Sequence, residues 1–193
     1  MKKLLAAVLA LGLAASLSAC SNDSLANQFR SGDNKNYISG DGSVTEFKSN
    51  LVSGKAWTEN TFDSQTLSSD AMKGHVIVLN FWYAGCAPCR AEVADLVKVT
   101  NEYKAKGVYV VGVNVRDSAE TAMAFARTHN LNYPSVMDIE SGSVVQAYTG
   151  VVSPSAVPTT LVLNTKGQVT ARVLGRFEPT TLRSLINTAV SGK

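Results

Sequence analysis

The sequence predicts an α/β fold with a central mixed β-sheet flanked by helices, and three observations support this. Two continuous β-branched runs, residues 76–82 and 108–115, are typical of buried central strands. A helical pattern follows each run. Two further strand patterns then surround Lys166-Gly167 near the C-terminus. The resulting order, β-α-β-α-β-β-α with a small strand region in front, implies mixed strand directions and helices on both faces.

The first elements are a small strand region, a central strand and a helix. Residues 44–70 carry short apolar stretches separated by Ser, Gly and Asn, which predicts a small hairpin or loosely paired strands as an N-terminal extension. The buried strand 76–82 follows. The next apolar positions recur at i, i+3, i+4 and i+7, so a helix is expected, ending at Gly107. These positions are Val93, Leu96, Val97 and Thr100.

The middle of the chain predicts a second strand and two helices. After the strand 108–115, Asp117 and Glu120 have the spacing of a capping box that opens a helix running to about Asn130. A short helix is expected over residues 143–148.

A hairpin and a helix are expected at the C-terminus. Residues 159–164 and 168–174 are predicted to pair around Lys166-Gly167. Pro179 then opens a final helix, because proline is favoured in a first helical turn. Its apolar face is expected to hold Leu182, Leu185, Ile186, Ala189 and Val190.

The N-terminus carries the pattern of an export signal. Met1-Lys2-Lys3 is followed by a short apolar run and by Leu17-Ser18-Ala19-Cys20, which resembles a bacterial lipobox. Residues 1–19 are therefore interpreted as a lipoprotein signal peptide and Cys20 as the lipidated residue. The alternative is an ordinary secretory signal that happens to contain a cysteine. Lipidation of Cys20 would leave an even number of thiols in an oxidising compartment.

The composition behind the signal predicts a tether and one globular domain. Residues 20–43 are rich in Ser, Asn, Asp and Gly, so they are expected to form a flexible tether, unless Tyr37-Ile38 docks on the domain. Residues 44–193 are expected to form the domain. Two of the positive charges behind the net charge of +3 belong to Lys2 and Lys3 of the signal, so nothing indicates nucleic acid binding.

Two cysteines between the first strand and its helix carry the chemistry. Cys86 and Cys89 follow Trp82-Tyr83-Ala84-Gly85, so the first sulfur is expected at the positive end of a helix dipole. There a thiolate is stabilised, and a thiol three residues on can resolve a mixed disulfide. The pattern thus indicates thiol–disulfide exchange, which needs no cofactor beyond the cysteine pair.

A set of motifs over residues 60–190 resembles the thioredoxin superfamily. They are Phe81-Trp82, Cys86-x-Pro88-Cys89 and Val157-Pro158-Thr159-Thr160. The resemblance is nearest to the membrane-anchored TlpA/ResA-like thiol–disulfide oxidoreductases. It implies a thioredoxin-like fold, with Cys86 as the exposed nucleophile and Cys89 as the more buried resolving thiol that forms a redox disulfide with it.

The resemblance also implies roles for residues around the pair. Pro88 matches the proline before the second cysteine. Pro158 matches a cis-proline packed opposite the disulfide, with Val157 offering its backbone to a substrate peptide; the alternative is a simple proline at the start of a strand. Trp82 is expected to pack under the site or to serve the core alone.

Three further positions near the cysteines are compared with the family pattern. In ResA-like proteins a glutamate at the offset of Glu92 lies in the active-site cavity, whereas a plain first-turn glutamate is the alternative. Asn80 stands where cytoplasmic thioredoxins have a buried aspartate. Gly85 departs from the family, in which a tryptophan usually precedes the first cysteine, so a bulky wall beside Cys86 is expected to be absent.

Other cysteine chemistries fit less well. Arg90 stands where a c-type haem site requires histidine. A zinc site needs four ligands, but His75 and His129 are the only histidines, and both are expected at the surface. No metal site is predicted.

The predicted function is an extracytoplasmic, lipid-anchored reductant of exported-protein disulfides. The resemblance implies apocytochrome c as substrate, in cytochrome c maturation, and a membrane electron-transfer partner at the outer face of the cytoplasmic membrane. Ala87-Pro88 offers the thiolate no side-chain hydrogen bond, which favours a reductant. The alternatives are a disulfide-forming oxidase, a thioredoxin-fold copper carrier and a non-catalytic binding module.

Overall fold

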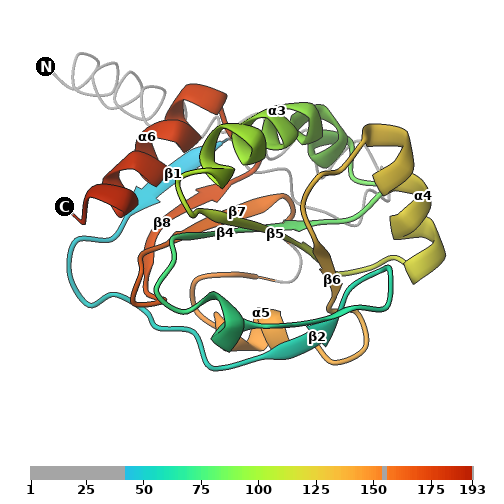
Figure 1. Ribbon diagram of the computed structural model, residues 1–193, viewed down its shortest axis with the longest axis horizontal. Helices are drawn as coiled ribbons and strands as arrows, with labels where there is room; N and C mark the ends of the chain where they lie inside the picture. Colours follow the sequence, from blue (N-terminus) through green and yellow to red (C-terminus); the bar gives the residue numbers. More distant parts are fainter. Residues whose placement is uncertain (1–41, 154–155, 193) are drawn as a thin grey trace, which may run out of the picture. The chain divides into compact units, whose positions relative to one another are not determined.

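Six strands form one mixed sheet in the order β1-β8-β7-β4-β5-β6, and β2 and β3 form a separate two-stranded hairpin that contacts β6 (Figure 1). The computed structural model describes residues 42–153 and 156–192. The predicted signal peptide 1–19, Cys20, Tyr37-Ile38 and the tether up to residue 41 lie outside the described residues. Within the described ranges, no helix is both long and apolar enough to cross a membrane.

The elements follow the predicted order, with additions at the start and in the middle. They are β1 (Ser43–Glu46), β2 (Thr58–Asn60), β3 (Thr66–Ser68), the 3-10 helix η1 (Ser69–Met72), β4 (Ile77–Trp82), α3 (Ala87–Lys104), β5 (Tyr109–Asn114), α4 (Ala119–His129), β6 (Ser135–Met137), α5 (Ser143–Ala147), β7 (Thr159–Leu163), β8 (Val169–Leu174) and α6 (Pro179–Ser191).

The sheet has the mixed strand directions that the sequence predicts. β4 pairs in parallel with β5, and β5 in parallel with β6. β4 pairs antiparallel with β7, as do β7 with β8 and β8 with β1. All six residues of β4 are buried because the strand lies in the middle of the sheet with both faces covered.

Helices cover both faces of the sheet. Figure 1 shows α3, α4 and α6 on one face, and α5 with the β2–β3 hairpin on the other. Beneath α3 and α6, the core contains Val78, Leu96, Val99, Phe177, Leu182 and Ile186. The core on the α5 side contains Trp57, Leu79, Val111, Val144, Leu161 and Leu163. Alternate residues of β4 point to opposite faces, so one continuous apolar run supplies both cores.

Strand β6 and the start of α4 differ from the sequence prediction. β6 was not predicted, because three residues are too short to show a strand pattern. The N-cap of α4 is Ser118, whose hydroxyl accepts the Thr121 N–H at 3.4 Å. The predicted Asp117–Glu120 capping box is therefore wrong, since the Asp117 carboxylate binds elsewhere.

The apolar face of α6 is narrower than predicted. Leu182, Leu185, Ile186 and Ala189 are buried, but Val190 is 47% exposed. Val190 lies at the edge of the apolar stripe and in the last turn of the helix, so the sheet does not cover it.

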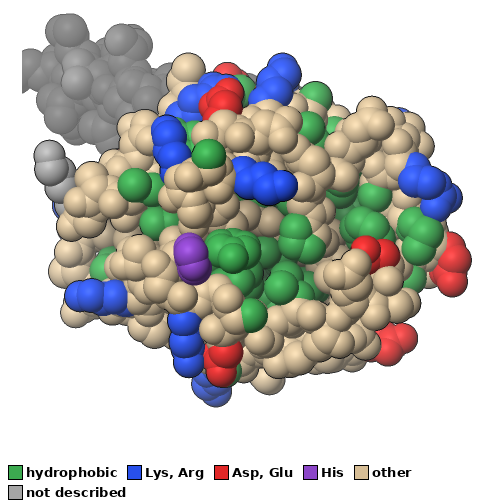
Figure 2. All heavy atoms as spheres, viewed as in Figure 1, with side chains coloured by type: hydrophobic (Ala, Val, Ile, Leu, Met, Phe, Trp, Pro, Cys, Tyr) green, Lys and Arg blue, Asp and Glu red, His purple; other side chains and the backbone are tan. Residues whose placement is uncertain are grey.

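The charged side chains on one face of the molecule are well mixed. Figure 2 shows lysine and arginine side chains dispersed among acidic ones on the face that it displays. The described part of that face therefore has no broad basic patch of the kind that binds nucleic acid.

Candidate active site

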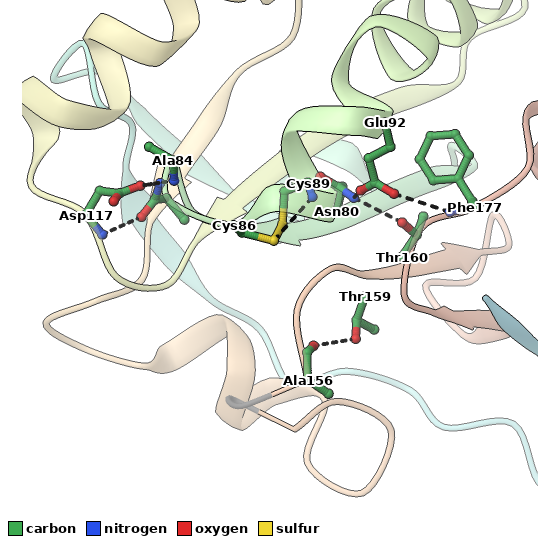
Figure 3. The surroundings of a disulfide bond; sticks show 11 residues. Asn80, Ala84, Cys86, Cys89, Glu92, Asp117, Ala156, Thr159, Thr160 and Phe177 are labelled. Atoms are coloured by element: carbon green, nitrogen blue, oxygen red, sulfur yellow. Dashed lines mark hydrogen bonds between the residues drawn. A yellow bond between two sulfur atoms is a disulfide. The ribbon is translucent and has the colours of Figure 1, made fainter. Parts of the chain in front are cut away.

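A disulfide between Cys86 and Cys89 lies at the start of α3, directly after the loop that follows β4 (Figure 3). The S–S distance is 2.07 Å. Cys86 is the N-cap residue, and its sulfur accepts the Cys89 N–H at 3.2 Å. Pro88 occupies the first turn, where its missing N–H leaves no helical bond unmade. The helix N-terminus thus offers its positive end to the Cys86 sulfur.

Both cysteine residues are buried from solvent in this disulfide form. Cys86 is 0% exposed and Cys89 is 3% exposed. The expectation that Cys86 is the exposed cysteine is therefore wrong for the oxidised state, because the sulfur is bonded to Cys89 and packed against the apolar core. The residues beside it, Gly85 and Ala87, are exposed.

The loop before β7 brings a cis-proline toward the disulfide. The Val157–Pro158 peptide bond is cis, and the Pro158 carbonyl accepts the Gly175 N–H at 2.8 Å. Thr159 pairs with Phe81 across β7 and β4, so Pro158 lies at the edge of the sheet where β4 ends. Val157 is buried, and the Thr159 hydroxyl donates to the Ala156 carbonyl at 2.6 Å (Figure 3).

Trp82 packs beneath the site and also belongs to the core. Its indole Nε1 donates to the Ser135 hydroxyl at 2.8 Å, and its ring lies 4.7 Å from that of Phe125. A narrow crevice beside α3 is lined by Trp82, Cys89 and four further residues, Asn80, Val93, Phe125 and Tyr133. Both roles considered for Trp82 therefore apply together.

Glu92 is a buried carboxyl one helical turn after Cys89. It is 1% exposed, and burial raises its pKa from 4.5 to about 8. Hydrogen bonds to the carboxyl oppose this rise without cancelling it: Asn80 Nδ2 donates to Oε1 at 2.8 Å, and the Phe177 N–H donates to Oε2 at 3.3 Å. The carboxyl is therefore mostly neutral at pH 7, which a solvated first-turn glutamate would not be.

Asn80 links this carboxyl to the rest of the site. Its Nδ2 also donates to the Thr160 hydroxyl at 3.0 Å, and the residue lines the same crevice as Cys89. Figure 3 shows Asn80 between the disulfide and Glu92. The structure thus brings Glu92, Cys89 and Thr160 together around Asn80, and Thr160 follows the cis-proline by two residues.

A clamp on the active-site loop was missed from the sequence. The Asp117 carboxylate accepts the Ala84 N–H and the Asn114 Nδ2–H, each at 2.7 Å (Figure 3). Asn114 Oδ1 in turn accepts the Arg116 and Asp117 N–H groups. An Asn at a strand end with an Asp three residues later is the signal that was available, because such residues form local side-chain turns.

An aromatic ring lies close to Gly85. A Cβ added at Gly85 would lie 3.3 Å from Cε2 of Tyr83. The ring of Tyr83 therefore occupies space next to the residue that precedes Cys86. The expected absence of a bulky wall beside Cys86 itself stays a prediction.

The fold and the site match a known protein family. A family model described as the AhpC/TSA family matches residues 50–172. The chain belongs to the AhpC/TSA family. This match contains the cysteine pair, Glu92, the Asp117 clamp and Pro158.

Curated relatives of this AhpC/TSA member include ResA proteins of three bacteria. "Thiol-disulfide oxidoreductase ResA" of Bacillus subtilis is 32% identical over 122 residues, which cover 63% of this chain and 65% of the relative. ResA of Oceanobacillus iheyensis is 28% identical over 155 residues, which cover 80% of this chain and 74% of the relative. The chain spans 58% of the ResA of Halalkalibacterium halodurans.

Solved structures with the same fold come from related proteins. A secreted thiol-disulfide isomerase of Corynebacterium glutamicum has a TM-score of 0.71 and 26% identity, covering 80% of this chain and 96% of its own. A DsbF homologue of Corynebacterium diphtheriae has a TM-score of 0.69 and 30% identity, covering 79% and 98%. These similarities confirm the predicted thioredoxin-like fold and the predicted ResA-like relationship.

The two histidines lie apart from the disulfide. His75 Nδ1 is 3.0 Å from the Gly107 carbonyl, at the start of β4, and the His129 ring lies 4.2 Å from that of Phe125. Both are partly buried, so the expected surface positions are only partly right. Within residues 42–153 and 156–192, no three His, Cys, Asp or Glu side chains are grouped to hold a metal ion.

Proposed function

We propose that this AhpC/TSA family member is an extracytoplasmic thiol–disulfide oxidoreductase that reduces disulfides of exported proteins. The observation that carries the proposal is the Cys86–Cys89 disulfide at the N-terminus of α3, in the same buried cluster as Val157 of the cis Val157–Pro158 bond. The names of the ResA relatives and of the secreted isomerase from C. glutamicum support it.

The reaction needs only the cysteine pair and the substrate. In the reduced protein, the Cys86 thiolate attacks one sulfur of the substrate disulfide, forms a mixed disulfide and releases the other sulfur as a thiolate, which takes up a proton. Cys89 then loses its proton and attacks Cys86, which frees the second substrate thiol. Two electrons pass to the substrate and the Cys86–Cys89 disulfide remains. The helix dipole at Cys86 favours the attacking thiolate.

The proposal also covers the direction of electron flow and the partners of the reaction. The side chains of Ala87 and Pro88 cannot donate a hydrogen bond to the thiolate, so the reduced form lacks an interaction that would make the pair a strong oxidant. The proposed substrates are exported proteins such as apocytochrome c. A membrane electron-transfer partner would reduce the Cys86–Cys89 disulfide again.

The proposed location is the outer face of the cytoplasmic membrane. The lipobox-like run Leu17-Ser18-Ala19-Cys20 supports a lipid anchor at Cys20, because two acyl chains suffice for stable attachment. Metabolic labelling with palmitate tests this, since Cys20→Ser is expected to abolish the label. A label retained by the Cys20→Ser protein would contradict the anchor.

Trapping of a mixed disulfide tests the activity. Replacing Cys89 by Ala removes the resolving thiol, so the Cys89→Ala protein is expected to accumulate mixed disulfides through Cys86 that a reductant dissolves. The matched control is Cys86→Ala, in which the attacking thiol is absent and few adducts are expected. Equal trapping by the two variants, or none by Cys89→Ala, would contradict the mechanism.

The reduction potential decides the direction. A reductant is expected to lie near the thioredoxin value of about −270 mV, and a disulfide-forming oxidase near the DsbA value of about −120 mV. The potential is measured by equilibrating the Cys86–Cys89 pair in glutathione buffers. Stoichiometric copper binding that requires both cysteines would instead support a thioredoxin-fold copper carrier.

A further inference from the structure

Arg116 lies over an aromatic ring beside the cysteine pair. Its guanidinium carbon is 4.6 Å from the centroid of the Tyr83 ring. Asn114 and Asp117 fix the loop that carries Arg116, and Asp117 holds this loop to the Ala84 N–H, two residues before Cys86. The position of Arg116 relative to the active-site loop is therefore set by a network of hydrogen bonds.

The Tyr83 ring connects this cation to the disulfide. The ring lies next to Gly85, where an added Cβ would be 3.3 Å from Cε2, and the Tyr83 carbonyl accepts the Cys86 N–H at 3.1 Å. Tyr83 is 8% exposed, whereas Gly85 is exposed and Arg116 partly so. A substrate segment that approaches Cys86 over Gly85 thus passes the edge of this stacked pair.

The positive charge of Arg116 is not neutralised by an ion pair within the described ranges. The nearest acids in sequence have other roles: Asp117 Oδ2 accepts two N–H donors, and Glu120 is an exposed residue of the first turn of α4. A second exposed cation, Arg90, lies one turn after Cys86. Cations are unfavourable at a helix N-terminus, so folding alone does not explain Arg90.

We propose that Arg116, stacked on Tyr83, binds an acidic side chain next to the cysteine of the substrate disulfide, with Arg90 adding to the positive field. The chemistry is that of a partly exposed guanidinium, which donates paired hydrogen bonds to a carboxylate. This inference rests on the proposed oxidoreductase function. It assigns acidic, cysteine-containing segments of exported proteins as the preferred substrates.

Matched disulfide peptides test the inference. Three peptides with one internal disulfide differ only in a Glu, Gln or Lys directly before the first cysteine. The second-order rate constant for their reduction by the fully reduced protein is measured, with hydroxyethyl disulfide as a neutral reference. The wild type is expected to reduce the Glu peptide about 2- to 5-fold faster than the Gln peptide, the range of an exposed ion pair.

Variants of two arginines separate the substrate contact from general charge effects. Arg116→Gln is expected to lower the Glu/Gln ratio to near 1, with only the weaker field of Arg90 left, and Arg116→Glu is expected to favour the Lys peptide instead. Arg127→Gln, at an exposed arginine of α4, is the matched control and is expected to keep the wild-type ratio. The wild-type preference is expected to fade between about 0.01 M and about 1 M salt, as screening shortens the range of the charge.

Two results would overturn the inference. One is a wild-type Glu/Gln ratio near 1 while hydroxyethyl disulfide is still reduced, which leaves the oxidoreductase function intact. The other is an Arg116→Gln protein that keeps the wild-type ratio but has a shifted reduction potential, because Arg116 would then act on the thiolate and not on the substrate. Failure to reduce any disulfide would overturn the proposed function itself.

Discussion

Asn80 donates a hydrogen bond from Nδ2 to Glu92 Oε1 at 2.8 Å, joining β4 to α3 beneath the disulfide. The same Nδ2 donates to Thr160 of β7, and Glu92 Oε2 accepts the Phe177 N–H from the segment between β8 and α6. Four separate parts of the chain are therefore joined by the hydrogen bonds of Asn80 and the buried Glu92 carboxyl. Because burial opposes ionisation there, this contact links the stability of the site to pH.

The stability of the protein is expected to fall as pH rises through the range in which Glu92 ionises. The folded-state pKa of Glu92 is about 8 and its ordinary value is 4.5, so the folded protein keeps a proton that the unfolded chain releases. The stability that the raised pKa of Glu92 contributes is fully present below the ordinary pKa. It is lost as the pH rises through the folded-state pKa. The slope is up to about 1.4 kcal/mol per pH unit, measurable by urea unfolding.

Glu92→Gln is the control for this pH dependence. The amide cannot ionise, so the decline between the two pKa values is expected to disappear. The Gln NH2 group would face donors from Asn80 or Phe177, which costs about 1–3 kcal/mol at every pH. The wild type is therefore expected to be more stable than Glu92→Gln at low pH, with a gap that narrows as pH rises. A gap independent of pH would contradict the raised pKa.

Asn80→Ala is expected to destabilise the protein by about 1–3 kcal/mol, since Glu92 Oε1 and the Thr160 hydroxyl lose their buried donor. It is also expected to move the pH-dependent decline to higher pH, because the Asn80 hydrogen bond lowers the pKa of Glu92. Urea unfolding across the pH range measures both effects. Asn132→Ala, at an exposed asparagine, is the matched control and is expected to change stability by less than about 0.5 kcal/mol.

The sequence predicts the central strands and the cysteine site well because their signals are local. The β4 and β5 runs are continuous, and the cysteine pair lies at the junction between a strand and a helix. Glu92 is different, since its burial depends on Phe177, which is distant in the sequence. The position of Glu92 relative to Cys89 indicates a shared helix face, but not which strand or loop covers that face.

The Asp117 clamp shows the same limit at a loop. Asp117 fits a capping box by spacing alone, yet Ser118 takes the cap because its hydroxyl reaches the Thr121 N–H. Whether the Asp117 carboxylate turns toward its own helix or toward Ala84 depends on how closely the loops after β4 and β5 approach. β4 and β5 are parallel neighbours, so both loops leave the same edge of the sheet.

Asp117→Ala is expected to loosen the active-site loop. It frees the Ala84 N–H and the Asn114 Nδ2–H, so a loss of about 1–3 kcal/mol in unfolding free energy is expected. Faster hydrogen exchange at the Ala84 amide is the local readout. Asp70→Ala is the control, because the Asp70–Lys73 ion pair is exposed and worth about 0–1 kcal/mol. Unchanged exchange at Ala84 would contradict the clamp.

Substituting alanine for either of two glycines near the site is expected to change the stability of the protein by very different amounts. Gly112 pairs with Asn80 on one side and Ser135 on the other, and an added Cβ would lie 2.6 Å from Ser135 Oγ and 2.8 Å from Trp82 Nε1. Gly112→Ala must therefore separate the two atoms of the Trp82–Ser135 hydrogen bond. The expected cost is about 1–3 kcal/mol from overpacking.

Gly85→Ala is the matched variant, and its expected effect is below about 0.5 kcal/mol. Gly85 is exposed, and among the described residues other than its chain neighbours its added Cβ comes within 4 Å of the Tyr83 ring alone, which is 3.3 Å away and can yield slightly. Urea unfolding of both variants gives the comparison, and the tryptophan fluorescence of Gly112→Ala is expected to shift because the Trp82 indole loses its partner. Equal costs for the two substitutions would mean that β5 and β6 can separate at Gly112 without disturbing Trp82.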